Sequence, residues 1–132
     1  MKKITIILLT FLSVIGYAQS NKIEKEEFFV FVDEMPQYPG GQSELMKFIQ
    51  QNLVFPESAV KNKTYGKCFV KFIVRKDGKI TDVMVLKGVP NCPECDEEAK
   101  KVFTKMPAWM PGKQNGKAVN VYYNQPINFQ PR

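Results

Sequence analysis

The sequence contains no histidine among its 132 residues, and it has only three cysteines and one tryptophan. Without histidine the chain lacks the usual general base and proton shuttle, as well as the commonest metal ligand. Catalysis by a Ser-His-Asp or a Cys-His arrangement is therefore excluded within this chain. Three cysteines alone make a weak set of zinc ligands. We therefore expect a binding domain and not an enzyme, with no cofactor, no metal site and no small-molecule substrate.

The sequence also lacks a concentrated block of positive charge. It has 19 Lys and Arg against 13 Asp and Glu, which gives a formal net charge of +6. The basic residues between Lys61 and Lys79 are scattered, whereas a nucleic-acid interface needs a clustered basic patch. We therefore predict no nucleic-acid partner. The length and the 44% hydrophobic content suit one globular domain with a packed core.

Residues 1–18 have the pattern of a secretory signal peptide. Lys2 and Lys3 precede an apolar stretch from Ile4 to Ile15, which is followed by Gly16-Tyr17-Ala18-Gln19. At a helical rise of 1.5 Å per residue this stretch spans about 18 Å, whereas the hydrocarbon core of a bilayer is about 30 Å thick. We therefore predict cleavage after Ala18 and export to the periplasm. The alternative is an uncleaved anchor in the inner membrane.

Hydrophobic patterning after this segment predicts a mixture of strands and helices. Residues 19–35 are expected to form a short N-terminal segment with one strand, and residues 36–132 the folded domain. The predicted strands are Phe28–Val32, Cys68–Val74, Ile80–Leu86 and Val119–Gln125, and the predicted helices are Leu45–Leu53, Pro56–Lys61 and Asp96–Met106. This order predicts an α+β fold, a two-layer sandwich with two main helices on one face of a small antiparallel sheet.

An ordered set of short motifs resembles the TonB C-terminal domain family. The set begins with Phe55-Pro56-x-x-Ala59 and Gly66, and it ends with Trp109-x-Pro111-Gly112-Lys113 and Pro126-Ile127-x-Phe129. The resemblance runs from about Pro36 to Phe129, nearly all of the predicted mature chain. It implies a periplasmic domain that grips the TonB box, a short extended segment of a TonB-dependent outer-membrane receptor.

The resemblance further implies recognition by β-augmentation, in which an extended peptide pairs with an exposed strand edge. Pro126 indicates such an edge, because proline removes a ladder donor and is confined to sheet edges, strand starts and bulges. An exposed edge also allows a homodimer through paired edge strands. The predicted partner-binding residues are Phe55, Pro56, Val121, Tyr122, Tyr123, Asn124 and Gln125.

A second motif competes for this role. Pro36-Gln37-Tyr38-Pro39 is similar to the glutamine-tyrosine-proline motif that the family uses near its receptor contact. The nine residues between Phe55-Pro56 and Gly66 instead place the family's aromatic-proline position at Phe55 and Pro56. We therefore assign the contact to Phe55 and Pro56, and we interpret Tyr38-Pro39 as a break before the first helix.

The sequence departs from the family's energy transducers at its N-terminus. A transducer needs a membrane-spanning helix and a long linker, whereas residues 19–35 reach about 60 Å at most when fully extended. We therefore expect a stand-alone exported domain that binds receptors but does not transmit force from the inner membrane. A short-anchored transducer is the alternative.

Two of the three cysteines form a Cys92-Pro93-Glu94-Cys95 motif between a predicted strand and a predicted helix. This placement resembles a thioredoxin-type redox motif, but the acidic residues around it oppose the thiolate that such a site needs. We therefore favour a structural Cys92–Cys95 disulfide, or an unpaired loop cysteine, over a thiol oxidoreductase. Cys68 is expected to be buried, and a bridge from Cys68 to Cys92 or Cys95 stays open.

Overall fold

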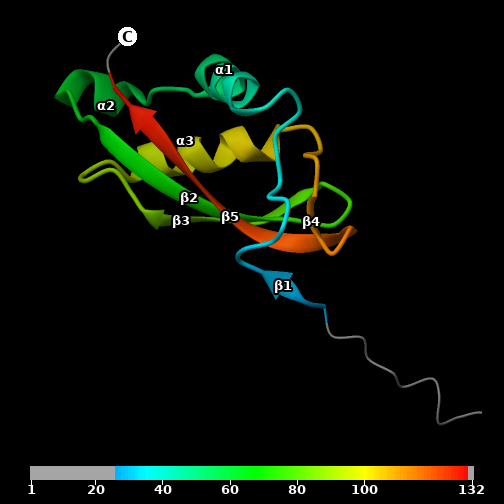
Figure 1. The fold of residues 1–132 in the computed structure, drawn as a ribbon. Coiled ribbons are helices and arrows are strands. Elements are labelled where there is room, and N and C mark those ends of the chain that lie inside the picture. Colours follow the sequence, from blue (N-terminus) through cyan, green and yellow to red (C-terminus); the bar gives the residue numbers. More distant parts are fainter. Residues whose placement is uncertain (1–25, 131–132) are drawn as a thin grey trace, which may run out of the picture.

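The computed structural model describes residues 26–130, so the predicted signal peptide lies outside the described residues (Figure 1). The elements are β1 (Phe28–Phe29), α1 (Gln42–Asn52), α2 (Glu57–Asn62), β2 (Gly66–Val74), β3 (Ile80–Lys87), α3 (Pro93–Thr104), β4 (Gly112–Gln114) and β5 (Lys117–Phe129). Helices α1 and α3 lie on the same side of the sheet (Figure 1). The structure thus confirms the predicted α+β class with two layers.

The long strand β5 organises the sheet, in which the strand order is β1-β5-β2-β3. It pairs with β2 in an antiparallel ladder that runs from Gly66 opposite Phe129 to Val74 opposite Val121. The short strand β1 pairs with β5 in parallel, with Phe28 opposite Asn120 and Phe29 opposite Val121. The sheet is therefore mixed and not purely antiparallel as predicted. Strand β4 pairs with the start of β5.

The core lies between the sheet and the helices because one side of β2 is apolar. Alternate side chains of β2, from Cys68 to Val74, are buried and face the helical layer. Helix α1 adds Leu45 and Ile49, and α3 adds Ala99, Val102 and Phe103, at the three- and four-residue spacing of an amphipathic helix. No helix of residues 26–130 lies on the opposite face of the sheet (Figure 1).

An aromatic cluster closes the end of the core beside β4. The Trp109 ring lies 5.3 Å from the Phe72 ring, 5.1 Å from the Tyr123 ring and 5.8 Å from the Tyr38 ring, all between centroids. Tyr38 is thus a core residue just before α1, as expected if Tyr38-Pro39 is a break in the chain. Its side chain is only 9% exposed.

The outer strand β3 is irregular. Its pairing with β2 shifts twice, between Phe69 and Val70 and again between Lys71 and Ile73. At each shift β3 carries one residue more than β2, and Asp82 has a φ of 54°. Such bulges twist an edge strand and interrupt the regular ladder that another strand would need. The β3 side of the sheet is therefore a poor template for pairing.

Candidate peptide-binding edge

Beyond Val121, strand β5 is paired on one side only. Val121 itself is flanked by Val74 of β2 and by Phe29 of β1. From Tyr122 to Phe129 the ladder with β2 continues, whereas no strand of residues 26–130 pairs with the other side. We call residues Tyr122–Phe129 the open edge.

Pro126 indicates which backbone groups of the open edge point outward. In an antiparallel ladder each residue turns both its N–H and its C=O either toward the partner strand or away from it. Proline has no N–H to donate, yet the ladder with β2 is unbroken at Pro126. Pro126 therefore lies at a position whose backbone groups point away from β2. Alternation then turns the N–H groups of Tyr122, Asn124 and Asn128 outward. The Pro126 carbonyl accepts a hydrogen bond of 3.0 Å from Gln125 Nε2.

The same alternation places some of the predicted partner-binding residues on the core face of the sheet and the others on the uncovered face. Val121 and Gln125 are 0% and 3% exposed, and the Tyr123 ring lies 5.6 Å from Phe72 in the aromatic cluster. These three side chains face the core, so the selectivity role predicted for Gln125 does not fit the structure. Val121 is also paired on both sides, which removes its backbone as a partner site. Asn124 is exposed, and Tyr122 is half-buried on the uncovered face.

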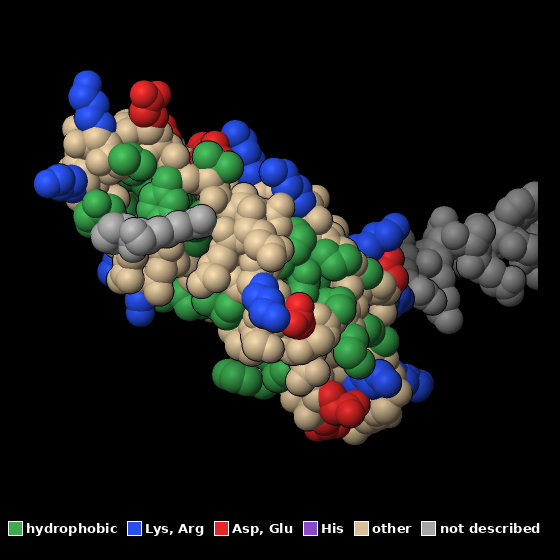
Figure 2. Space-filling view, turned by 90° about the horizontal axis from the view of Figure 1, so that it is seen from above, with side chains coloured by type: hydrophobic (Ala, Val, Ile, Leu, Met, Phe, Trp, Pro, Cys, Tyr) green, Lys and Arg blue, Asp and Glu red, His purple; other side chains and the backbone are tan. Residues whose placement is uncertain are grey.

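Phe55 lies near the C-terminal end of the open edge, as part of a groove between α1 and β5. The Phe55 ring packs edge-on against Phe129, with 5.5 Å between centroids. Pro56 is the N-cap residue of α2. The groove has a volume of about 430 Å³ and is lined by Met46, Ile49, Gln50, Leu53, Phe55, Pro126, Ile127, Asn128 and Gln130. Figure 2 shows hydrophobic side chains exposed at the end of the molecule where α2 and the C-terminus lie.

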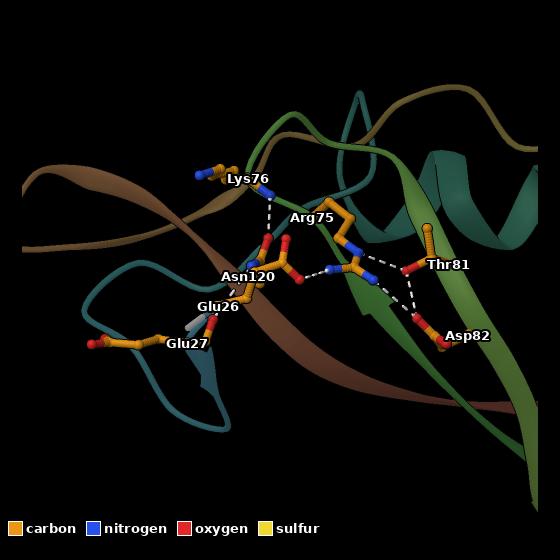
Figure 3. Close-up of polar contacts among 7 residues, drawn as sticks. All are labelled: Glu26, Glu27, Arg75, Lys76, Thr81, Asp82 and Asn120. Atoms are coloured by element: carbon orange, nitrogen blue, oxygen red, sulfur yellow. Dashed lines mark hydrogen bonds and ion pairs between the residues drawn. The ribbon is translucent and has the colours of Figure 1, made fainter. Parts of the chain in front are cut away.

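Arg75 holds the N-terminal segment against the sheet (Figure 3). Its Nη1 lies 3.0 Å from Glu26 Oε2, and its Nη2 lies 3.2 Å from Asp82 Oδ2. Nε donates a hydrogen bond of 2.8 Å to Thr81 Oγ1, and the guanidinium lies 5.3 Å from the centre of the Phe28 ring. One arginine thus connects β3 to the strand that occupies the edge of β5.

The buried Asn120 anchors the same segment from β5 (Figure 3). Its Oδ1 accepts a hydrogen bond of 2.9 Å from the Lys76 N–H, and its Nδ2 donates one of 3.3 Å to the Glu27 carbonyl. The Phe28 ring packs 5.8 Å from the Tyr122 ring. No local pattern marks Arg75 or Asn120, because the N-terminal residues that they bind, Glu26 and Glu27, lie 49 and 93 residues away along the chain.

A family model described as Gram-negative bacterial TonB protein C-terminal matches residues 51–131. The chain belongs to the TonB C-terminal domain family. This family consists of transport energy-transducing and interaction modules, is periplasmic in Gram-negative bacteria and is not a known enzyme family. The domain therefore takes part in TonB-dependent transport. Among residues 26–130 no helix is long and apolar enough to cross a membrane.

Two solved structures of a TonB C-terminal domain share the fold, and a third solved structure is similar in sequence. The NMR structure of Helicobacter pylori TonB-CTD (residues 194–285) is 18% identical, with a TM-score of 0.50, covering 67% of this chain and 90% of that chain. That of residues 179–285 is 23% identical, with a TM-score of 0.50, covering 71% and 87%. The Pseudomonas aeruginosa TonB CTD is 28% identical with a TM-score of 0.47, covering 58% and 76%. No curated protein matches the chain significantly.

The cysteines of this TonB C-terminal domain are all inside the protein. A disulfide joins Cys92 and Cys95, which are 2% and 0% exposed, and Cys68 is unpaired and buried. Burial, with a smaller contribution from Asp96, raises the pKa of the Cys68 thiol to about 12. Thiol–disulfide exchange needs an accessible sulfur and a thiolate. The sulfurs of the Cys92–Cys95 disulfide are buried, which favours a structural disulfide at the start of α3 over the redox alternative.

Proposed function

We propose that this TonB C-terminal domain binds extended segments of outer-membrane receptors by β-augmentation at the open edge, in the periplasm. The observation that carries the proposal is the eight-residue stretch of β5 that is paired on one side only. An incoming strand would pair with the outward backbone groups of β5, which have no partner strand among residues 26–130. The double bulge of β3 makes the opposite side of the sheet a much poorer site.

Strand β1 supports this proposal from within the chain. It already pairs with β5 in parallel on the side away from β2, and the chain bends away after Phe29. The pairing of β1 ends at Val121 of β5, and the open edge begins on the same side of β5 at the next residue, Tyr122. A receptor segment would therefore continue the line of β1, starting at Tyr122.

Photo-crosslinking in living cells tests the site. A photoreactive residue at Asn124, which is exposed on β5, is expected to capture the N-terminal segments of outer-membrane receptors. The matched control is Lys101, exposed on α3, the helix that contacts β2 and β3. Equal capture from Asn124 and Lys101 would contradict the proposal, and so would the absence of receptor adducts at Asn124. Adducts between two copies of the chain would indicate a homodimer through this edge.

A proline substitution tests the backbone pairing itself. Asn124→Pro removes an outward N–H while leaving the hydrogen bonds to β2 in place, as Pro126 already does two residues later. We expect it to abolish binding of a synthetic peptide that copies the receptor segment captured by crosslinking. Asn124→Ala removes only the side chain and is expected to keep most of the affinity. If both variants bind like the parent, the peptide does not pair with this edge.

We further propose that residues 1–18 are a signal peptide that is removed on export. The intact mass of the periplasmic protein tests this directly. A mass that includes Met1 to Ala18 would instead support the short-anchored transducer.

A further inference from the structure

The contacts of β1 show how this sheet holds a strand on the edge of β5. Besides the backbone pairing, an aromatic ring of β1 packs on Tyr122, and a carboxylate just before β1 is bound by a basic residue that directly follows β2. That basic residue, Arg75, lies between Glu26 on one side and Asp82 of β3 on the other (Figure 3). A strand on the edge of β5 is therefore also bound by a cation that comes from the end of β2, on the other side of β5.

Lys71 repeats this arrangement four residues earlier on β2, next to the open edge. It lies opposite Asn124 of β5, and its Nζ is 4.4 Å from the centre of the Tyr122 ring. The ammonium group thus lies over the ring of a β5 side chain on the uncovered face of the sheet. Because neighbouring strands are about 4.8 Å apart, a strand added at the open edge would place its side chains beside this ammonium group.

The charge of Lys71 is not neutralised within the described part of the chain. The ion pairs of residues 26–130 involve Lys47, Arg75, Lys100 and Lys101, and none involves Lys71. The nearby acids Glu26 and Asp82 both pair with Arg75. Lys71 is half-buried, and the Tyr122 ring fixes its position. A preorganised, unneutralised cation beside a binding edge favours an anionic partner.

We propose that Lys71 selects receptor segments that carry an acidic side chain on the residue opposite Tyr122 or Asn124. The partner is thus an extended peptide with a carboxylate on the uncovered face of the sheet. The inference rests on the proposed function, because it needs a peptide paired with the open edge. Lys71 would contribute to the choice between segments, while the backbone of β5 would bind all of them.

A series of synthetic peptides tests the inference. The probes are blocked heptapeptides of alternating Thr and Val, in which a single Glu is moved through the seven positions, each with a matched Gln peptide. Their affinities are measured by NMR titration. We expect one position at which Glu binds roughly fivefold more tightly than Gln, the size of one partly desolvated ion pair, and we expect salt to reduce this ratio.

Variants of the protein distinguish a specific effect of Lys71 from an effect of the protein's overall positive charge. Lys71→Met keeps most of the aliphatic stem, so it should abolish the preference for Glu while leaving the affinity for the Gln peptides unchanged. Lys101→Met on α3, the helix that contacts β2 and β3, removes the same charge away from the open edge and should keep the preference. Lys71→Glu should favour peptides that carry Lys at the same position. Unchanged NMR spectra away from the substitution establish that each variant is folded.

The outcomes distinguish the two proposals. If peptides bind at the open edge but Glu has no advantage, or if the advantage survives in Lys71→Met, the role of Lys71 is refuted and the binding edge stands. If none of the peptides shifts the resonances of Tyr122–Phe129, the binding edge itself is refuted.

Discussion

A pair of glycine substitutions tests how the β2–β3 hairpin is fixed to the core. Gly78 and Gly116 both lie in hairpin turns with positive φ, at 88° and 79°. The Gly78 carbonyl accepts a hydrogen bond of 2.8 Å from the Trp109 N–H. A Cβ on Gly78 would collide with the Trp109 carbonyl oxygen, whereas a Cβ on Gly116 would meet nothing within 4 Å. The two sites therefore differ in close contact and hardly at all in backbone conformation.

The expected free energies follow from this difference. A non-glycine residue in the left-handed region costs about 1 kcal/mol, and both Gly78→Ala and Gly116→Ala should lose this amount. Overpacking against rigid backbone adds roughly 1–3 kcal/mol at Gly78 alone. We therefore expect Gly116→Ala to lower the free energy of unfolding by about 1 kcal/mol and Gly78→Ala by about 2–4 kcal/mol.

Urea unfolding followed by the fluorescence of Trp109, the sole tryptophan, measures both values. Equal losses for Gly78→Ala and Gly116→Ala would refute the close contact between the hairpin and Trp109. A loss that is larger at Gly116 would refute the description of both turns.

Three further predictions concern the cysteines and Arg75. Replacing Cys92 and Cys95 by serine opens a short loop and should cost about 2 kcal/mol of unfolding free energy by the chain-entropy relation; no loss in urea unfolding would contradict a stabilising disulfide. Cys68 should not react with a thiol reagent at pH 8 until the protein unfolds. Folding raises the pKa of the Cys68 thiol to about 12, whereas an unfolded thiol ionises near 8.5. The free energy of unfolding should therefore fall as the pH rises from about 8.5 to about 12, and it should fall less steeply in Cys68→Ala. Arg75→Met should speed hydrogen exchange at Phe29 but lower global stability by less than about 1 kcal/mol; unchanged exchange would show that Arg75 does not hold β1.

The sequence predicted the main elements because their signals are local. Alternation from Cys68 to Val74 and the spacing of Leu45 and Ile49 each mark one buried face, and the structure places those faces in the core. The last strand was harder. Its two faces carry similar side chains, because Tyr122 lies on the uncovered face and Tyr123 on the core face. The next two residues are both polar amides, yet Asn124 is exposed and Gln125 is buried. Polarity alone therefore does not show that Gln125 is buried and Asn124 exposed.

The remaining features depend on residues that are far apart in the sequence. Strand β1 has only two residues, and its place in the sheet follows from contacts such as Arg75 with Glu26. The bulge in β3 places Asp82 at positive φ without a glycine to mark it. Tertiary pairing decides both features, and no local pattern encodes them.

The asymmetry of the sheet sets the valency of the domain. With β3 bulged twice and only β5 regular along its outer side, a single strand can be added per molecule. If two copies paired through this side of β5, neither copy would have a regular strand edge left, and assembly would stop at a closed dimer. Growth into a fibre needs two complementary sides on each subunit. A domain built in this way can expose strand backbone without becoming a seed for polymerisation.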